Sequence, residues 1–295
     1  MLKYDSIAEL VEAATKEGKK ISELVLADQA AAAEADPATL YARMEKNFDV
    51  MCASVEAGAT KDQVSISGLT GGEGYQMFSY AKQSAGGLCG RFMTEAMARA
   101  LSVADCNASM GRIVASPTAG SCGILPGCLV SLYKEGRAEK QDIVMSMFTS
   151  GAFGMVIAKN ASIAGATGGC QAECGSASGM AAAALVELMG GTPAMCGDAL
   201  AMAIANQLGL ACDPVAGLVE IPCIKRNVSG VMIAFSSADM ALAGIRARIP
   251  VDECIEAMQS VGDMMNSALK ETAGGGLAAT PTGRKLKERV FGAEE

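Results

Sequence analysis

Cysteines in glycine-rich or proline-flanked segments are the residues of this chain best suited to chemistry. Cys170 and Cys174 stand four residues apart in GGCQAECGSASG, and Cys212 and Cys223 form the two ends of CDPVAGLVEIPC. Cys122 lies in a third such segment, SPTAGSCG. No pair has the CxxC spacing typical of redox motifs and common zinc modules. Soft thiolate ligands without that spacing favour an iron–sulfur cluster, zinc or Cu(I), and packed, unreactive thiols are an equal alternative.

Six further cysteines lie in or beside apolar stretches of helical character. A free cysteine in such a position behaves as a small hydrophobic residue, so we expect these six to pack in the core. They are Cys52, Cys89, Cys106, Cys128, Cys196 and Cys254. The segment IKRN, directly after Cys223, is different in character. It carries Lys225, Arg226 and Asn227, and cations and amide donors stabilise thiolates and bound anions.

The 295 residues include no histidine, which limits the possible chemistry. Catalytic Ser-His and Cys-His pairs, histidine-ligated zinc and the commonest general base are all excluded. Any such base must be another residue type or come from another chain. Pyridoxal phosphate is not favoured either, because it needs a Schiff-base lysine beside a glycine-rich phosphate loop, and the first lysine after SPTAGSCG is Lys134. The nucleotide-binding patterns GxGxxG and GxxxxGK[ST] are also missing.

Composition and charge exclude several partners. The net charge of −8 argues against a nucleic-acid backbone or an anionic membrane surface as a partner. The apolar run 161–200 contains Glu173, Glu187 and Asp198, so we interpret it as a loop followed by a buried helix and not as a membrane span. An N-terminus without an apolar signal core, together with eleven cysteines, predicts a cytoplasmic protein in a reducing compartment.

Helical patterns dominate the rest of the sequence, and runs of β-branched residues with a period of two are scarce. Asp36 and Pro37 predict a helix start and Gly58 its end. We therefore expect an all-α fold with glycine-rich loops around the active site. A single catalytic domain is expected over 1–295, with an N-terminal helical segment (1–57) and a binding core (58–295). The expected loops are 67–74, 84–90, 116–123, 165–175 and 272–283.

Four motifs then carry a resemblance to a known family: SPTAGSCGILPG, GATGGCQAECGSASGMAAAAL, QLGLACDPVAGLVEIPCIKRN and ETAGGGLAATPTG. In this order they resemble the α chain of the iron–sulfur-dependent bacterial L-serine dehydratases, over roughly residues 20–290. The resemblance implies a [4Fe–4S] cluster held by Cys170, Cys212 and Cys223. Three ligands leave one iron open to act as a Lewis acid on L-serine, which loses water and then ammonia to give pyruvate. It implies no role for pyridoxal phosphate.

The same resemblance suggests residues that bind the substrate. Ser116 and Thr118 can donate hydrogen bonds to the carboxylate of L-serine, together with backbone N–H groups near Gly120. Thr70 and Gly71, in LTGGEG, are candidates for a similar role. An ordinary turn explains the 116–120 segment equally well.

Arg226 and Asn227, which follow Cys223, are assigned to the surroundings of the cluster. Arg226 would offset the negative charge of the cluster, and Asn227 would support it from the same segment. Two further cysteines stay open, because Cys174 as a fourth ligand would close the site and Cys122 could also contact iron.

The resemblance also implies a second chain. Single-chain members of the family carry an additional domain with a histidine-bearing substrate motif, whereas this sequence has no histidine and corresponds to the α region. We therefore expect a hetero-oligomer with a separate β chain, which is one source for the unidentified base. A cysteine desulfidase with the same type of cluster, a non-catalytic iron–sulfur sensor or electron carrier, and a structural subunit with inert thiols are the alternatives.

Overall fold

The computed structural model describes residues 3–83 and 86–292 of the chain. It is 68% helical, and the described residues form no β-strand, which confirms the expected all-α fold. Their one isolated β-bridge pairs Cys212 with Lys270. The expected loop at 84–90 falls partly on residues outside the described ranges.

Three N-terminal helices form one edge of the molecule: α1 (Ile7–Glu17), α2 (Ile21–Ala32) and α3 (Pro37–Gly58). The caps explain their bounds. The Asp36 side chain accepts a hydrogen bond from the backbone N–H of Ala38, and Pro37 occupies the first helical position. Gly58 is the last residue of α3, as the sequence predicts, and a Cβ at this position would lie 1.7 Å from the carbonyl oxygen of Ser102, so only glycine fits there.

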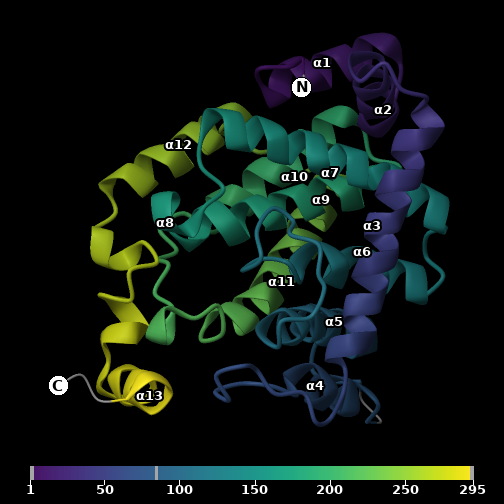
Figure 1. Cartoon of the computed structure of the whole chain (residues 1–295). Coiled ribbons are helices and arrows are strands. Elements are labelled where there is room, and N and C mark those ends of the chain that lie inside the picture. Colours follow the sequence, from purple (N-terminus) through teal and green to yellow (C-terminus); the bar gives the residue numbers. More distant parts are fainter. Residues whose placement is uncertain (1–2, 84–85, 293–295) are drawn as a thin grey trace.

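The central helices surround α9 (Ser176–Leu188), whose alanine-rich sequence is buried on all sides. Small residues let its neighbours approach closely: a Cβ on Gly179 would lie 2.4 Å from the Leu200 side chain of α10. Figure 1 shows α9 and α10 in the middle of the molecule, with α3 along one flank and α12 on the opposite one. The helices of this centre are α5 (Gly90–Ala108), α6 (Ile124–Lys134), α7 (Lys140–Asn160), α10 (Pro193–Ala205) and α11 (Cys223–Leu242).

The remaining helices lie at the periphery. They are α4 (Glu73–Ala81), α8 (Gly165–Gly168), α12 (Val251–Met264) and α13 (Pro281–Phe291). The basic segment 283–289 lies within α13. In Figure 1, α13 lies near the C-terminal end of the trace, well separated from α1.

Two sequence predictions are wrong. The segment 165–175 is not a loop: α8 and a π-helical turn, Gln171–Gly175, lead directly into α9. The buried Gln171 amide explains the difference, since it donates to the carbonyls of Gly168 and Met258, each at 2.9 Å, and holds the glycine-rich turn against α12. Cys89, which was expected in the core, is exposed.

One helix, α7, is long and apolar enough to cross a membrane, but 67% of the relevant window is buried inside the protein. Its apolar character is therefore explained by its place in the helical core. The run 161–200, which the sequence suggested as a buried helix after a loop, is divided among α8, the π-helical turn, α9 and part of α10.

Candidate active site

Three cysteines from separate segments come together beside the π-helical turn. Cys170 immediately precedes that turn, Cys212 lies in the extended segment after α10, and Cys223 is the first residue of α11. All three are buried, and each thiol interacts electrostatically with the other two or with their shared neighbours. The backbone holds Cys212 in place, because its N–H donates to the carbonyl of Leu269 at 2.8 Å. The structure thus brings together the three thiols that the family resemblance implies as ligands.

The thiols differ in their tendency to ionise. The Cys170 and Cys174 sulfur atoms share a hydrogen bond at 3.4 Å, which lowers the pKa of Cys170, and the Arg226 guanidinium lowers it further. Burial raises the pKa of Cys212, and it raises the pKa of Cys223 to about 12. Burial therefore opposes ionisation of Cys212 and Cys223, and compensating positive charge in the site would favour their thiolate forms.

That preference fits an iron–sulfur cluster. Metal binding displaces thiol protons, and an iron–sulfur cluster is held by thiolates. In the described ranges, no three Cys, Asp or Glu side chains are grouped closely enough to hold a single metal ion. A cluster does not need such a group, because its protein ligands bind different iron atoms. The three thiols are thus a donor set that a cluster could use.

The two remaining candidate ligands are placed differently. Cys174 is fully buried behind Cys170, and its pKa is raised well above the usual value by the hydrogen bond to Cys170 and by burial. Cys122 is also fully buried and lies 4.0 Å from the carbonyl oxygen of Val103, on α5. Cys174 is thus an immediate neighbour of the three thiols, whereas Cys122 packs against a core helix.

Glu173 is a site residue that the sequence analysis missed. Its carboxylate accepts a 2.6 Å hydrogen bond from the Thr118 hydroxyl. Two glycines make room for it: a Cβ on Gly120 would lie 3.1 Å from one carboxylate oxygen, and a Cβ on Gly165 would lie 2.9 Å from the other and 2.8 Å from the Cys212 sulfur. Burial raises the pKa of this carboxyl group. A charged residue between two cysteines in an otherwise small and apolar motif was the signal that could have found it.

The predicted substrate loop lies against this carboxylate. Thr118 contacts Glu173, and its hydroxyl is also 3.1 Å from that of Ser121. The Ser116 hydroxyl is buried and has no hydrogen-bond partner within the described part of the chain. Ser22, Ser150, Ser176 and Ser237 in the described ranges share this feature, so it is compatible with a ligand at Ser116 but does not by itself identify one.

Asn227 joins this loop to the cysteine-bearing helix. Its amide nitrogen donates to the carbonyls of Gly120 and Cys223, both at 2.9 Å, and its oxygen accepts from the N–H of Gly123 at 2.8 Å. All the partners are backbone groups, so the side chain of Asn227 acts as a buried brace between the loop and α11. A role in supporting the site from behind, as expected from the sequence, is compatible with these contacts.

Arg226 connects the thiols to the C-terminal loop. Its guanidinium donates to the carbonyl of Ala211 and to the carboxylate of Asp213, both at 2.7 Å. The other oxygen of Asp213 accepts from the N–H of Leu277, also at 2.7 Å. The AGGGLAAT loop is therefore attached, through Asp213, to the cation that lies beside Cys170.

Thr70 and Gly71 occupy a neighbouring position. The Thr70 hydroxyl donates to the buried carboxylate of Glu220 at 2.7 Å, and the N–H of Gly71 donates to Glu73, also at 2.7 Å. Glu220 belongs to the segment between Cys212 and Cys223, so this loop packs on the cysteine segment. No hydrogen bond within the described ranges joins Thr70 or Gly71 to the 116–121 loop, so the two predicted substrate loops are not directly connected.

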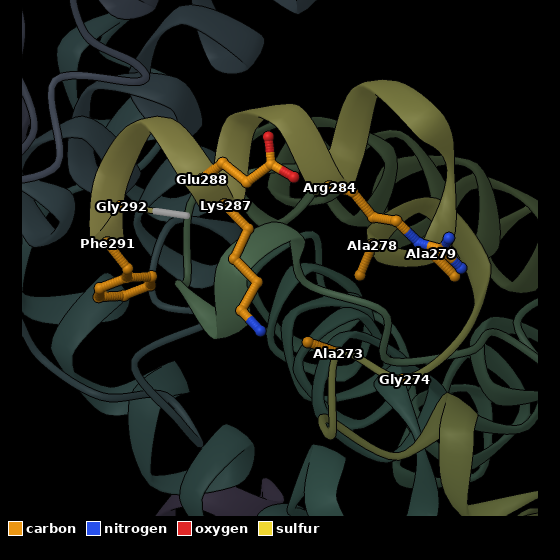
Figure 2. Close-up of a pocket in the computed structure, with 9 residues that line it drawn as sticks. All are labelled: Ala273, Gly274, Ala278, Ala279, Arg284, Lys287, Glu288, Phe291 and Gly292. Carbon is orange, nitrogen blue, oxygen red and sulfur yellow. The ribbon is translucent and has the colours of Figure 1, made fainter. Parts of the chain in front are cut away.

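A cavity of about 380 Å³ lies between α13 and the glycine-rich loop before it (Figure 2). In Figure 2 the side chain of Lys287 extends from the helix toward the part of the loop that carries Ala273 and Gly274. None of its lining residues is a cysteine, so this cavity is separate from the three thiols. It borders the same loop that contacts Asp213.

The chain thus combines an all-α fold with a buried site at which thiols, a carboxylate and hydroxyl groups lie together. The chain matches the serine dehydratase alpha chain family over residues 16–278 and belongs to that family, which makes it a lyase. It is similar to the probable L-serine dehydratase, alpha chain, of Bacillus subtilis (strain 168), with 46% identity over 98% of this chain and 96% of the relative.

Two further relatives show how the family is organised. The L-serine dehydratase, alpha chain, of Peptoniphilus asaccharolyticus is 44% identical over 95% of both chains. The L-serine dehydratase of Streptomyces coelicolor is 36% identical over 92% of this chain but only 59% of its own length. The family therefore includes proteins of about this length and longer proteins that contain a corresponding region.

Proposed function

We propose that this chain is the α chain of an L-serine dehydratase that converts L-serine to pyruvate and ammonium with a [4Fe–4S] cluster. The observation that carries the proposal is the convergence of Cys170, Cys212 and Cys223 next to Glu173 and the Ser116–Thr118 segment. Two of the similar proteins are named as alpha chains of L-serine dehydratase, which supports the same substrate.

Cys170, Cys212 and Cys223 would hold the cluster, which when bound supplies a Lewis acid for the departing hydroxyl group of the substrate. Arg226 lies beside Cys170 and lowers its pKa, so it favours the thiolate form that ligation requires. The N-terminus of α11 begins at Cys223 and adds a favourable electrostatic potential there.

The loop residues would position the amino acid. The buried Ser116 hydroxyl lacks a partner in the described part of the chain and can donate to the substrate carboxylate, and the Thr118 hydroxyl lies close by. Gly120 is braced by Asn227, which keeps the loop at a fixed distance from Cys223. Burial of these groups excludes water and strengthens their interaction with a charged ligand.

The base that removes the Cα proton is not assigned to a residue of this chain, and a separate β chain is proposed as its source. Two relatives are named as alpha chains, and the longer Streptomyces coelicolor relative contains a large part that this chain does not cover. The proposed assembly is a hetero-oligomer in the cytoplasm, with no nucleic-acid or membrane partner. Pyridoxal phosphate has no place in this proposal.

The test is a product assay on protein purified without oxygen, alone and with its β chain. Pyruvate and ammonium are measured with L-serine, and sulfide is measured with L-cysteine. We expect pyruvate from L-serine, with strong dependence on the β chain. Sulfide as the main product would instead indicate a cysteine desulfidase. Absence of turnover in iron-loaded protein with its β chain present would favour a non-catalytic iron–sulfur protein.

A further inference from the structure

Glu173 is a largely buried carboxylate whose hydrogen-bond donor is a neutral group, the hydroxyl of Thr118, at 2.6 Å. Across residues 3–83 and 86–292, no ion pair joins Glu173 to a lysine or arginine. The surroundings add to the cost of its charge, because Glu271 and, when ionised, the cysteine thiols oppose a second negative charge.

Arg226 is the cation that favours the charged form of Glu173, but its hydrogen bonds are directed elsewhere. Its two terminal nitrogens are occupied by the carbonyl of Ala211 and by Asp213, both at 2.7 Å. Arg226 therefore compensates Asp213 directly and reaches Glu173 only as a weaker, more distant charge. The carboxylate of Glu173 is left available for another cation.

The surroundings of the Glu173 carboxylate also favour a bound cation. One oxygen faces Thr118 and Gly120, in the proposed substrate loop, and the other faces Gly165 and the Cys212 sulfur. Both glycines lie so close that a Cβ would crowd a carboxylate oxygen. The absence of a side chain at these two positions therefore leaves space beside the Glu173 carboxylate. An α-amino acid that interacts with the loop through its carboxylate would carry its ammonium group next to these atoms.

We infer that Glu173 binds the α-ammonium group of the amino-acid substrate and thereby selects α-amino acids over α-hydroxy acids. This inference rests on the proposed function. An ammonium group offers three donors and a positive charge, and a charge-assisted hydrogen bond to a largely buried carboxylate is among the stronger polar contacts. Thr118 holds one carboxylate oxygen and leaves the other available to the ligand.

The test compares two ligands that differ only at this group. L-serine and L-glycerate share the carboxylate and the hydroxyl, but glycerate has a hydroxyl where serine has the ammonium. Their dissociation constants are taken from the anaerobic stopped-flow change in cluster absorbance, which records binding before L-serine is turned over, on the holoenzyme with its β chain, for the wild type and Glu173→Gln. We expect the dissociation constant of L-serine to rise by about 30-fold in the variant and that of L-glycerate by less than about threefold.

Two further variants make the result decisive. Glu187→Gln is a matched control, because Glu187 is a buried carboxylate that also accepts a threonine hydroxyl, from Thr149 at 2.8 Å, but lies at the other end of α9. It should leave both dissociation constants within about threefold of the wild type. Glu173→Asp keeps the charge and should retain the preference for L-serine, even if Glu173→Gln binds iron poorly.

The inference is overturned if Glu173→Gln binds L-serine as the wild type does, if it loses both ligands equally, or if Glu173→Asp loses the preference. Failure of the proposed function has a different signature. In that case the iron-loaded wild type itself would bind neither ligand, and no comparison among variants would be needed.

Discussion

Two groups of buried thiols in this protein differ in their neighbours and not in their burial. Cys128 on α6 and Cys196 on α10 lie in the helical core, where burial alone strongly raises the pKa of Cys128 and is the main reason for the high pKa of Cys196. Cys170 and Cys223 are almost as deeply buried, yet the Arg226 guanidinium acts on both of them to lower the pKa. Burial therefore does not distinguish a ligand from a core residue, and the charged and polar groups around the sulfur do.

The largest effect is expected when one substitution from each group is compared. Cys170→Ser should abolish cluster assembly and reduce kcat/KM by about a thousandfold or more, because the Lewis acid supplies several kcal/mol of transition-state stabilisation. Cys196→Ala should keep its iron and its activity and lose about 1–2 kcal/mol of unfolding free energy through the cavity it leaves. Iron analysis and denaturant unfolding measure both. Equal iron content in the two variants would remove the distinction between the groups.

A second comparison tests whether the cation beside the thiols matters. Arg226→Lys keeps the charge but loses the planar guanidinium that reaches Ala211 and Asp213 together. We expect a roughly 10- to 100-fold loss of cluster affinity or activity, as is usual for groups that support metal ligands. The rate at which visible absorbance is lost in air provides the measurement. Lys225→Arg, at an exposed residue beside Arg226, is the control and should behave as the wild type.

A smaller effect is expected at the brace between loop and helix. Asn227→Ala leaves the N–H of Gly123 and the carbonyls of Gly120 and Cys223 without this partner. We expect about 2 kcal/mol of lost unfolding free energy and a roughly tenfold rise in KM for L-serine, because the substrate loop loosens. Asn206→Ala, at an exposed position after α10, should change neither quantity. An unchanged KM in Asn227→Ala would show that the brace stabilises the fold only.

The smallest effect is expected at Asp105, a buried carboxylic acid away from the three thiols, where stability should depend on pH. Burial raises the pKa of Asp105 to about 7, although the N–H of Gly74 donates to it at 2.9 Å. Because the carboxyl group in the unfolded chain is ionised above about pH 4, the folded state binds an extra proton between about pH 4 and 7. The contribution of this group to stability is thus complete below about pH 4 and is lost as the pH rises through about 7.

Asp105→Asn should remove this pH dependence. We expect the melting temperature of the variant to exceed that of the wild type by a few degrees at about pH 8 and to converge with it toward about pH 4. Glu12→Gln, at an exposed residue of α1, should follow the wild type throughout. A constant difference between Asp105→Asn and the wild type across the pH range would show that Asp105 does not titrate in this window.

The sequence predicted local structure well where single residues determine it. Asp36 and Pro37 begin α3, as their backbone preferences require, and Gly58 is its last residue, as predicted. The π-helical turn after Cys170 was not predicted, because it depends on the contacts of Gln171 with distant carbonyls and not on local propensity. Composition alone made 165–175 resemble a loop.

For the candidate site, too, local sequence patterns could be interpreted, whereas contacts between distant residues could not. The cysteine pattern singled out five loop cysteines, and the family resemblance implied Cys170, Cys212 and Cys223 among them as ligands, which stays a prediction. The contacts of Glu173 and Asp213 could not be predicted in this way, since their partners, Thr118 and Leu277, lie 55 and 64 residues away along the chain. A carboxylate acquires such contacts only when the fold brings those partners to it.

The central claim is that the three loop thiols hold a cluster with an iron open to substrate. Its most direct test is to purify the protein without oxygen, quantify iron and acid-labile sulfide, and record visible spectra with and without L-serine. We expect about four irons and four sulfides per chain, and a spectrum that L-serine changes. A colourless protein without iron from the same preparation would contradict the claim and place all the described cysteines among ordinary buried or surface thiols.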